Sequence, residues 1–198
     1  MIKSKSSSRV MNNPIFIEKI ASEDILRNNA TTEDITFVEQ FSNAKRRCEV
    51  LAWRAIVRRE LGAKAVIFYD EYGAPKVDNP NKYISVSHSK EYVAVYIADG
   101  PCAIDIESAN RDFCRVASRY LSIQEQQIAK EYDIFAEMWS AKEALYKYYK
   151  KGNLDLVRDI SIIDYNRIAS QLVASILGSL PIVVNLGRCG NLVVATIG

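Results

Sequence analysis

The chain has 198 residues, of which 48% are hydrophobic and 25% are charged. This composition excludes a disordered protein and supplies enough apolar side chains for a buried core. The formal net charge of +2 at pH 7 is too small to indicate a nucleic-acid partner by itself. No apolar run approaches the roughly 18 residues that a membrane helix requires.

The cysteines show no C-x-x-C pair and no Cys/His spacing typical of a metal site. No apolar signal segment precedes them, so we expect a protein of the reducing cytoplasm. The start of the chain is polar and basic, and we expect residues 1–12 to form a flexible tail.

The first half of the chain alternates strand and helix patterns. A strand is predicted over residues 14–20, and Ser22 opens a short helix or turn. Apolar residues at helical spacing predict a helix that Ser42 caps and Gly62 ends, with arginines beside its apolar face. A basic helix of this kind, taken alone, is more often a solvated surface than a binding site.

Further strands are predicted over residues 65–69, 83–89 and 91–98. The pair Asp99-Gly100 follows, and two strands that flank Asp-Gly are typical of a hairpin. We therefore expect the next strand to pair with its predecessor and to bring its own acids to an edge of a sheet.

That next strand, Ala103–Glu107, alternates isoleucines with acids. The period of two places Asp105 and Glu107 on one face and the isoleucines on the other. Asp105 and Glu107 could equally be ordinary surface acids of a hairpin, because a lone D-x-E pattern is common.

Helices are predicted over residues 111–121, from the capping box of Ser122 and Glu125, and from Asp133 to about residue 150. In the last helix Glu143 and Lys147 are four residues apart and share one face, which is also the spacing of a simple surface salt bridge. Beyond it, short apolar runs predict a closing antiparallel sheet.

Taken together, the strand acids and the helix acid suggest a magnesium site that faces a phosphate. Magnesium prefers hard oxygen ligands and leaves positions for water and phosphate oxygens. The chain has a single histidine, His88, between two serines. A lone histidine is usually structural, but here it is one of the cationic groups that could balance phosphate charge. No catalytic triad and no Walker glycine loop is present, so an external hydroxyl is the simplest nucleophile.

Four motifs resemble those of the Sfp-type 4'-phosphopantetheinyl transferases, which load acyl or peptidyl carrier proteins from coenzyme A. The G-[IV]-D-x-E motif resembles Ala103–Glu107, and [FW]-[ST]-x-K-E-[AS]-x-x-K is matched at every fixed position by Trp139–Lys147. The S-H-S motif is Ser87–Ser89, and the basic helix motif resembles Arg46–Arg54. The motifs follow the family's order over about half of the chain.

The resemblance implies an enzyme that transfers phosphopantetheine to a carrier-protein serine. Asp105, Glu107 and Glu143 would hold Mg2+, with Mn2+ as an alternative ion, on the pyrophosphate of coenzyme A. Glu143 would also accept the serine proton, directly or through water. The alkoxide would attack the β-phosphate, and 3',5'-ADP would leave.

The resemblance also implies roles for basic residues. Lys147 and His88 would neutralise pyrophosphate charge and act with Glu143 as catalytic residues. Arg46 and Arg54 would bind the 3'-phosphate, and Lys142 would lie beside the same phosphates. The full set of implied cofactor-binding residues is Arg46, Arg54, Ser87, His88, Lys142 and Lys147.

For the fold, the resemblance implies an α+β protein with two similar lobes, antiparallel sheets and a pseudo-twofold relation, divided as residues 13–100 and 101–198. The partners would be coenzyme A and an apo carrier protein of fatty acid, polyketide or nonribosomal peptide synthesis, with no nucleic acid and no membrane. Two lobes in one chain favour a monomer.

The chain departs from the family pattern at two positions. Ala103 replaces the glycine before the isoleucine-aspartate pair, which costs little in an ordinary strand. The family's G-K-P turn reads Gly73-Ala74-Pro75, so the lysine expected to touch coenzyme A is absent, and Lys76 begins two residues after the alanine.

Two other classes of protein remain as alternatives. One is a module that binds coenzyme A or a carrier protein without catalysis, against which the presence of all three acids argues. The other is a metal-dependent nuclease with a D…E-x-K site, which needs its second acid and its lysine two apart on a strand. Glu143 and Lys147 are instead four apart on a predicted helix.

Overall fold

The structure, a computed structural model, describes residues 14–198. The predicted tail at residues 1–12 lies outside the described residues. The strands are β1 (Ile15–Lys19), β2 (Ile67–Tyr69), β3 (Pro75–Val77), β4 (Tyr83–Ser89), β5 (Tyr92–Ala98), β6 (Ala103–Ser108), β7 (Ile160–Asn166), β8 (Gln171–Ile176), β9 (Ile182–Cys189) and β10 (Leu192–Ile197). The helices are α1 (Glu23–Asn28), α2 (Thr32–Val38), α3 (Ala44–Leu61), α4 (Ile123–Tyr132) and α5 (Phe135–Tyr149), with a 3-10 helix at Cys114–Arg119.

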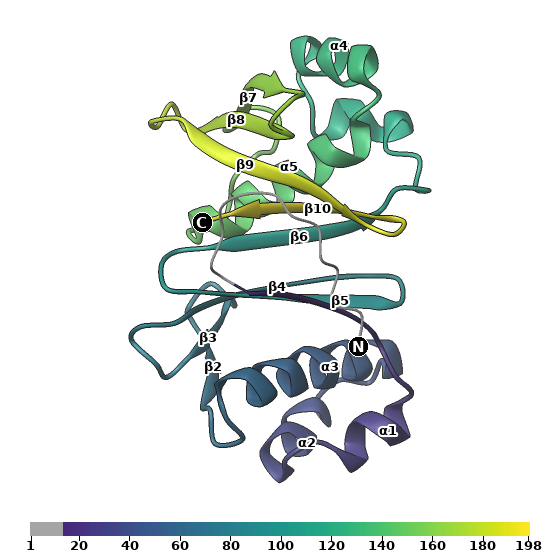
Figure 1. The fold of residues 1–198 in the computed structure, drawn as a ribbon, viewed down its shortest axis with the longest axis vertical. Coiled ribbons are helices and arrows are strands. Elements are labelled where there is room, and N and C mark those ends of the chain that lie inside the picture. The colour runs from purple at the N-terminus through teal and green to yellow at the C-terminus, as the bar shows by residue number, and fades with distance from the viewer. Residues whose placement is uncertain (1–13) are drawn as a thin grey trace.

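The first half forms a three-stranded antiparallel sheet in the order β1-β5-β4, with α3 packed on one face (Figure 1). An apolar core between α3 and this sheet includes Val50, Ile56 and Val93, which are fully or almost fully buried. The predicted helix is confirmed, although its cap is Asn43, whose side chain accepts a hydrogen bond from the backbone N–H of Arg46, one residue after the predicted Ser42. Packing of α3 against the sheet buries the apolar stripe of the helix.

Helix α2 was not among the elements predicted from the sequence. Thr31 caps this helix through a hydrogen bond from the backbone N–H of Asp34 at 3.2 Å. The helix is short and its apolar residues are few, so its pattern is weak. It nevertheless brings two acids, Glu33 and Asp34, against α3.

The second half forms a five-stranded antiparallel sheet in the order β6-β10-β9-β8-β7, with α5 packed against it (Figure 1). The predicted closing sheet is therefore confirmed. The capping box of Ser122 and Glu125 is also confirmed, since both of its hydrogen bonds are present. Asp133 does not cap the next helix as predicted. It ends α4 in the left-handed conformation, with φ 52°.

The predicted hairpin at Asp99-Gly100 is wrong. β5 pairs with β1 and β4, whereas β6 pairs with β10. Pro101 follows the glycine directly and has no N–H to donate, which disfavours a tight two-residue turn with continued pairing. The segment instead carries the chain from one sheet to the other. β6 is nevertheless an edge strand, as predicted for the strand with the acids.

The two sheets meet along β4 and β6. The backbone N–H groups of Ile104 and Ile106 donate to the hydroxyl oxygens of Ser85 and Ser87, at 3.0 and 3.1 Å. Residue numbers rise together along both strands, so β4 and β6 run in the same direction. Serine side chains thus satisfy the edge of β6 where no backbone ladder is formed.

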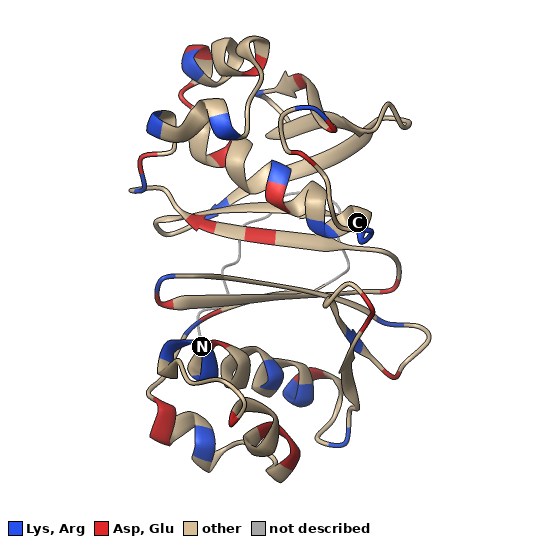
Figure 2. Cartoon of the chain, turned by 180° about the vertical axis from the view of Figure 1, so that it is seen from behind, with Lys and Arg blue, Asp and Glu red and all other residues tan. Residues whose placement is uncertain are grey.

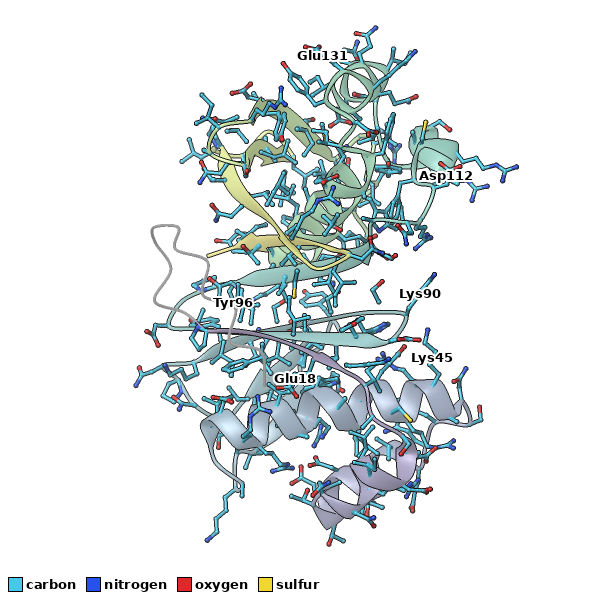
Figure 3. The ribbon with its side chains drawn as sticks, turned by 45° about the vertical axis from the view of Figure 1, so that its right-hand side comes forward. Glu18, Lys45, Lys90, Tyr96, Asp112 and Glu131 are labelled. Carbon is cyan, nitrogen blue, oxygen red and sulfur yellow. The ribbon has the colours of Figure 1, made fainter. Side chains whose placement is uncertain are left out.

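Apolar side chains fill the junction behind these serines. Tyr96, Ile104 and Ile106 are fully buried there. The Tyr96 hydroxyl donates to the carbonyl oxygen of Gly198 at 3.1 Å, which ties β5 to the residue that follows β10. Figure 3 labels Tyr96 where the two sheets meet. Because the junction has its own buried cluster, the two sheets hold β4, β6 and α5 in a fixed relation.

Three further predictions concern organisation. The helix predicted over residues 111–121 is reduced to the six-residue 3-10 helix at Cys114–Arg119. Within residues 14–198, no helix is long and apolar enough to cross a membrane. The mixed α+β class is confirmed, whereas the pseudo-twofold relation of two lobes divided near residue 100 stays a prediction.

Candidate active site between β4, β6 and α5

A cavity of about 300 Å³ lies where β4, β6 and α5 meet. Figure 2 shows acidic residues along β6 and both acidic and basic residues along α5 beside it. Six of the residues singled out in the sequence line this cavity: Ser87, His88, Asp105, Glu107, Glu143 and Lys147. Residues as far apart in the sequence as Ser87 and Lys147 are therefore gathered at one place by the junction of the sheets.

The acids of β6 reach the cavity because the strand alternates. Ile104 and Ile106 are buried in the junction, and Asp105 and Glu107 project to the other face, as predicted. Asp105 Oδ1 accepts a hydrogen bond from the Ser87 hydroxyl at 2.8 Å. Glu107 accepts from the Ser89 hydroxyl at 3.0 Å and pairs with Arg111 at 3.0 Å. The serines of β4 thus orient both acids.

One face of α5 supplies the rest of the cavity wall. Trp139, Glu143 and Lys147 follow one another at intervals of four residues and all line the cavity. Burial raises the pKa of Glu143, the nearby Asp105 and Glu107 raise it further, and Lys147 offsets part of the effect. Among residues 14–198, no hydrogen bond or ion pair holds the Glu143 carboxylate. Glu143 is therefore a carboxylate with a raised proton affinity and free oxygens.

Lys147 connects the helix to the strand. Its ammonium lies 2.8 Å from Asp105 Oδ1 and 3.1 Å from the carbonyl oxygen of Ile104. Its side chain is 30% exposed, so the charge still reaches the cavity. A cation thus shares the cavity with Asp105, Glu107 and Glu143 and can also meet an incoming anion.

The other oxygen of Asp105 bears on the question of a metal ion. Asp105 Oδ2 is buried and has no hydrogen-bond partner among the described residues, which is a costly state for a carboxylate oxygen. Glu107 and Glu143 line the same cavity, and carboxylate oxygens are the ligands that Mg2+ prefers. The carboxylate oxygens of these residues are therefore chemically suited to bind a divalent cation. Even so, no three His, Cys, Asp or Glu side chains within residues 14–198 are drawn together as a ready-made metal cluster.

His88 and Arg46 lie together at the rim. Arg46 Nη1 is 3.2 Å from His88 Nε2, and His88 Nδ1 is 3.4 Å from Glu49 Oε1. Burial lowers the pKa of His88 and the charges of Arg46 and Lys147 lower it further, while Glu49 opposes the shift. A neutral imidazole that accepts from Arg46 and turns its Nδ1–H towards Glu49 is consistent with both contacts. Glu49 was not among the site residues predicted from the sequence.

Arg54 is not available to a ligand, so its predicted contact with a 3'-phosphate is wrong. Its side chain is 1% exposed and pairs with Asp34 and Glu33 of α2. The guanidinium also lies 4.8 Å from the centre of the Phe37 ring. A buried guanidinium needs carboxylate partners, and the unpredicted helix α2 supplies them.

Lys142 is likewise wrong as a neighbour of the phosphates. Its side chain is fully buried, and its ammonium is held by Glu125 at 2.8 Å and by the carbonyl oxygens of Leu156 and Ile160 at 2.7 and 2.8 Å. Adjacent helix residues point about 100° apart, so the residue next to Glu143 faces the protein interior. Ser87, by contrast, lines the cavity, and its contact with a cofactor stays a prediction.

Comparisons with known proteins agree with this geometry over part of the chain. Residues 101–183 match the model of the 4'-phosphopantetheinyl transferase superfamily. The chain is 34% identical over 89 residues to the 4'-phosphopantetheinyl transferase Sfp of Bacillus subtilis strain 168, an alignment that covers 41% of this chain and 40% of Sfp. It is 32% identical over 89 residues to the transferase gsp of Aneurinibacillus migulanus, covering 42% of this chain and 37% of that protein.

A similar match, 32% identity over 100 residues, is found with the transferase psf-1 of Bacillus pumilus and covers 46% of this chain and 43% of that protein. The matched part thus spans about two fifths of the length of these relatives. The matched region contains β6 and α5, the two elements that carry the acids. The resemblance drawn from the motifs is confirmed at this level: residues 101–183 match the model of the 4'-phosphopantetheinyl transferase superfamily, and the similar proteins are named 4'-phosphopantetheinyl transferases.

Proposed function

We propose that this protein transfers the 4'-phosphopantetheine group of coenzyme A to a serine hydroxyl of an apo acyl or peptidyl carrier protein and releases 3',5'-ADP. The observation that carries the proposal is the cavity in which Asp105, Glu107, Glu143 and Lys147 come together. Its two acidic elements lie inside the segment that matches the superfamily. In the reaction the serine oxygen bonds to the β-phosphorus while the bond from that phosphorus to the bridging oxygen breaks, so the pyrophosphate link is divided.

Asp105, Glu107 and Glu143 are the residues that would hold Mg2+, or Mn2+ in its place. When bound, the ion would neutralise negative charge on the pyrophosphate and orient it. The unpartnered Asp105 Oδ2 supports this assignment, because a cation would satisfy it. Ser87 and Ser89 keep the two strand acids turned towards the cavity.

Glu143 is the proposed general base. A base is most effective when its pKa lies near the working pH, and the burial and neighbouring acids that raise the pKa of Glu143 move it in that direction. The carboxylate would take the proton of the carrier-protein serine, directly or through one water molecule. Its free oxygens are consistent with this task.

Lys147 and His88 are proposed to face the pyrophosphate. Lys147 donates to Asp105 and lies partly exposed at the cavity, so an anion can share its ammonium. The imidazole of His88 would gain a proton when a phosphate approaches, since a negative charge raises its pKa. Arg46, half exposed beside His88, is the arginine we retain for the 3'-phosphate.

The carrier protein, the pathway it serves and the cellular setting are part of the proposal. We propose an apo carrier protein of fatty acid, polyketide or nonribosomal peptide synthesis as the acceptor. We also propose a cytoplasmic monomer whose halves, residues 13–100 and 101–198, form the two walls of the site. The cysteines of the described chain are unpaired, in keeping with a reducing compartment.

The test is the intact mass of apo carrier proteins after incubation with coenzyme A, Mg2+ and the protein. A gain equal to phosphopantetheine supports the transferase, and a carrier whose acceptor serine is replaced by alanine should gain nothing. Binding of coenzyme A or of the carrier without any mass gain would instead support the non-catalytic module. Cleavage of a DNA or RNA substrate in place of transfer would support the nuclease.

A further inference from the structure

A second cavity, of about 290 Å³, adjoins the first and shares Val86 and Lys147 with it. The turn Gly73-Ala74-Pro75 forms part of its wall, together with Tyr146 at the end of α5. Two further lysines line it, Lys76 of β3 and Lys150, the residue that ends α5. The cavity is therefore an apolar hollow with three ammonium groups around it.

Lys150 occupies an unusual backbone position. It has φ 60° and ψ 3°, the left-handed conformation at which helices commonly end with glycine. A side chain at this position strains the backbone, because its Cβ atom crowds the following carbonyl oxygen. Gly152 follows only two residues later. A lysine is thus present where local backbone energetics favour a residue without a side chain.

The ammonium of Lys150 is also poorly compensated. Burial lowers its pKa, and the positive charge of Lys76 lowers it further. Within residues 14–198, no carboxylate lies within salt-bridge distance of Lys150, and its ammonium lies 5.4 Å from the centre of the Tyr83 ring. Lys76 has one acidic partner, Asp70, at 3.5 Å. Two half-buried ammonium groups therefore share a cavity wall with a single carboxylate, and an anion between them would remove their repulsion.

Lys76 and Lys150 lie close to the turn where this chain lacks the lysine of the family's G-K-P pattern. The family pattern places a lysine between the glycine and the proline, where this chain has Ala74. Ala74 lines the same cavity as Lys76 and Lys150. The charge missing from the turn is therefore present in the same hollow, brought in from β3 and from the end of α5.

We propose that Lys150, together with Lys76, binds a phosphate group of the donor substrate in this second cavity. The inference rests on the proposed function for the identity of the donor, but the site itself is defined by the paired ammonium groups. Two sources share the required chemistry, the 3'-phosphate on the ribose and the pyrophosphate. Both are multiply charged oxyanions that accept hydrogen bonds from lysine.

The experiment measures dissociation constants by isothermal titration calorimetry for three probes, coenzyme A, dephospho-coenzyme A and 3',5'-ADP. Wild type is compared with Lys150→Gln, Lys76→Gln and Lys150→Gly. Lys151→Gln is the matched control, because it removes the neighbouring charge from an exposed lysine that does not line the cavity. Loss of one charge-assisted hydrogen bond should weaken binding of coenzyme A by about tenfold to a hundredfold in each cavity variant. The Lys151→Gln variant should bind as the wild type does.

The same experiment distinguishes the 3'-phosphate from the pyrophosphate. If Lys150 contacts the 3'-phosphate, dephospho-coenzyme A should bind equally to wild type and Lys150→Gln, while 3',5'-ADP loses affinity. If Lys150 contacts the pyrophosphate, coenzyme A and dephospho-coenzyme A should lose affinity together. Unchanged affinity of all three probes in Lys150→Gln, or an equal loss in Lys151→Gln, overturns the inference.

Thermal melting distinguishes ligand binding from a structural role. Lys150→Gly relieves the left-handed strain and removes a poorly compensated ammonium, so the variant should melt no lower than the wild type while its affinity for coenzyme A falls. A lower Tm together with unchanged affinity would show a structural lysine. Because these measurements need no carrier protein, they stay informative if transfer itself fails. If the variants bind coenzyme A normally and transfer at the wild-type rate, this inference is refuted and the proposed function is not.

Discussion

The ammonium of Lys147 lies 2.8 Å from Asp105 Oδ1 and so links the helix that carries Glu143 to the strand that carries Asp105 and Glu107. The same lysine lines both cavities. A displacement of α5 relative to β6 would therefore move the strand acids, the proposed base Glu143 and the proposed phosphate contacts together. The ion pair between Lys147 and Asp105 thus helps to fix the position of α5 relative to β6.

Glu143 should make the folded protein less stable as pH rises. Its pKa is raised by burial and by Asp105 and Glu107, so its contribution to stability is full below the ordinary value of 4.5 and is lost as pH rises through the folded-state pKa. Glu143→Gln cannot ionise, and its Tm should exceed that of the wild type by a margin that grows with pH. Melting curves from about pH 4 to about pH 8 test this. The exposed Glu39→Gln is the control, and a margin that is flat with pH, or that reverses, would contradict the assignment.

Asp105→Asn should weaken binding of a divalent ion. The change removes charge from the buried oxygen that lacks a partner, and it also breaks the ion pair with Lys147. Binding of Mn2+, followed by electron paramagnetic resonance in the absence of any carrier protein, should weaken by at least about tenfold. Asp112→Asn, a change of a surface acid outside the cavity, should bind Mn2+ as the wild type does. Equal Mn2+ binding by all three proteins would refute the ligand role.

Lys142→Met should damage stability rather than catalysis. Removing the ammonium leaves Glu125 without its cation in the protein interior, and breaking a buried pair of this kind costs about 3–5 kcal/mol. Urea unfolding measures the loss, and Lys130→Met on the exposed side of α4 is the control. At a temperature where the variant is folded, its KM for coenzyme A should be close to that of the wild type. A stable variant with a much higher KM would restore Lys142 to the phosphate site.

His88 should be neutral at pH 7 in the free protein. The chain has one histidine, so every imidazole signal in the NMR spectrum belongs to His88. Burial lowers its pKa below the ordinary 6.5, Arg46 and Lys147 lower it further, and Glu49 opposes the shift. Its contribution to stability is therefore present above pH 6.5 and is lost as pH falls through the folded-state pKa. The positive groups that face the ring are Lys45 and Arg46 of α3 and Lys147 of α5.

Two changes should move the His88 titration in opposite directions. Glu49→Gln removes the carboxylate that lies 3.4 Å from His88 Nδ1 and should lower the pKa of the imidazole further. Addition of 3',5'-ADP should raise it, because a phosphate stabilises the charged ring. Glu39→Gln should leave the titration unchanged. A pKa that does not respond to 3',5'-ADP would remove His88 from the phosphate contacts.

The face on which each active-site side chain lies was predictable from the sequence, because it depends only on local periodicity. A period of two in β6 separates Asp105 from the isoleucines, and a spacing of four in α5 aligns Glu143 with Lys147. Neither inference needs knowledge of what packs against the element. Both agree with the structure for the same reason, since strand and helix geometry are the same in every fold.

The partners of β6 and of the buried basic residues were not predictable in this way. β6 pairs with β10, which follows it by more than eighty residues, and a local turn signal at Asp99-Gly100 outweighed that distant partner in the prediction. From the sequence alone, Arg54 and Lys142 were predicted to be cations available to a phosphate. Their burial depends on acids of α2 and α4 that only tertiary packing brings near.

Intact-mass analysis of one apo carrier protein, incubated with coenzyme A and Mg2+ and either the wild-type protein or Glu143→Gln, tests the central claim most directly. The account predicts a phosphopantetheine mass gain with the wild type and a rate at least about a hundredfold lower with Glu143→Gln, whose fold stays intact. An equal rate of gain with both proteins, or no gain with the wild type across carrier proteins that it binds, would contradict the claim.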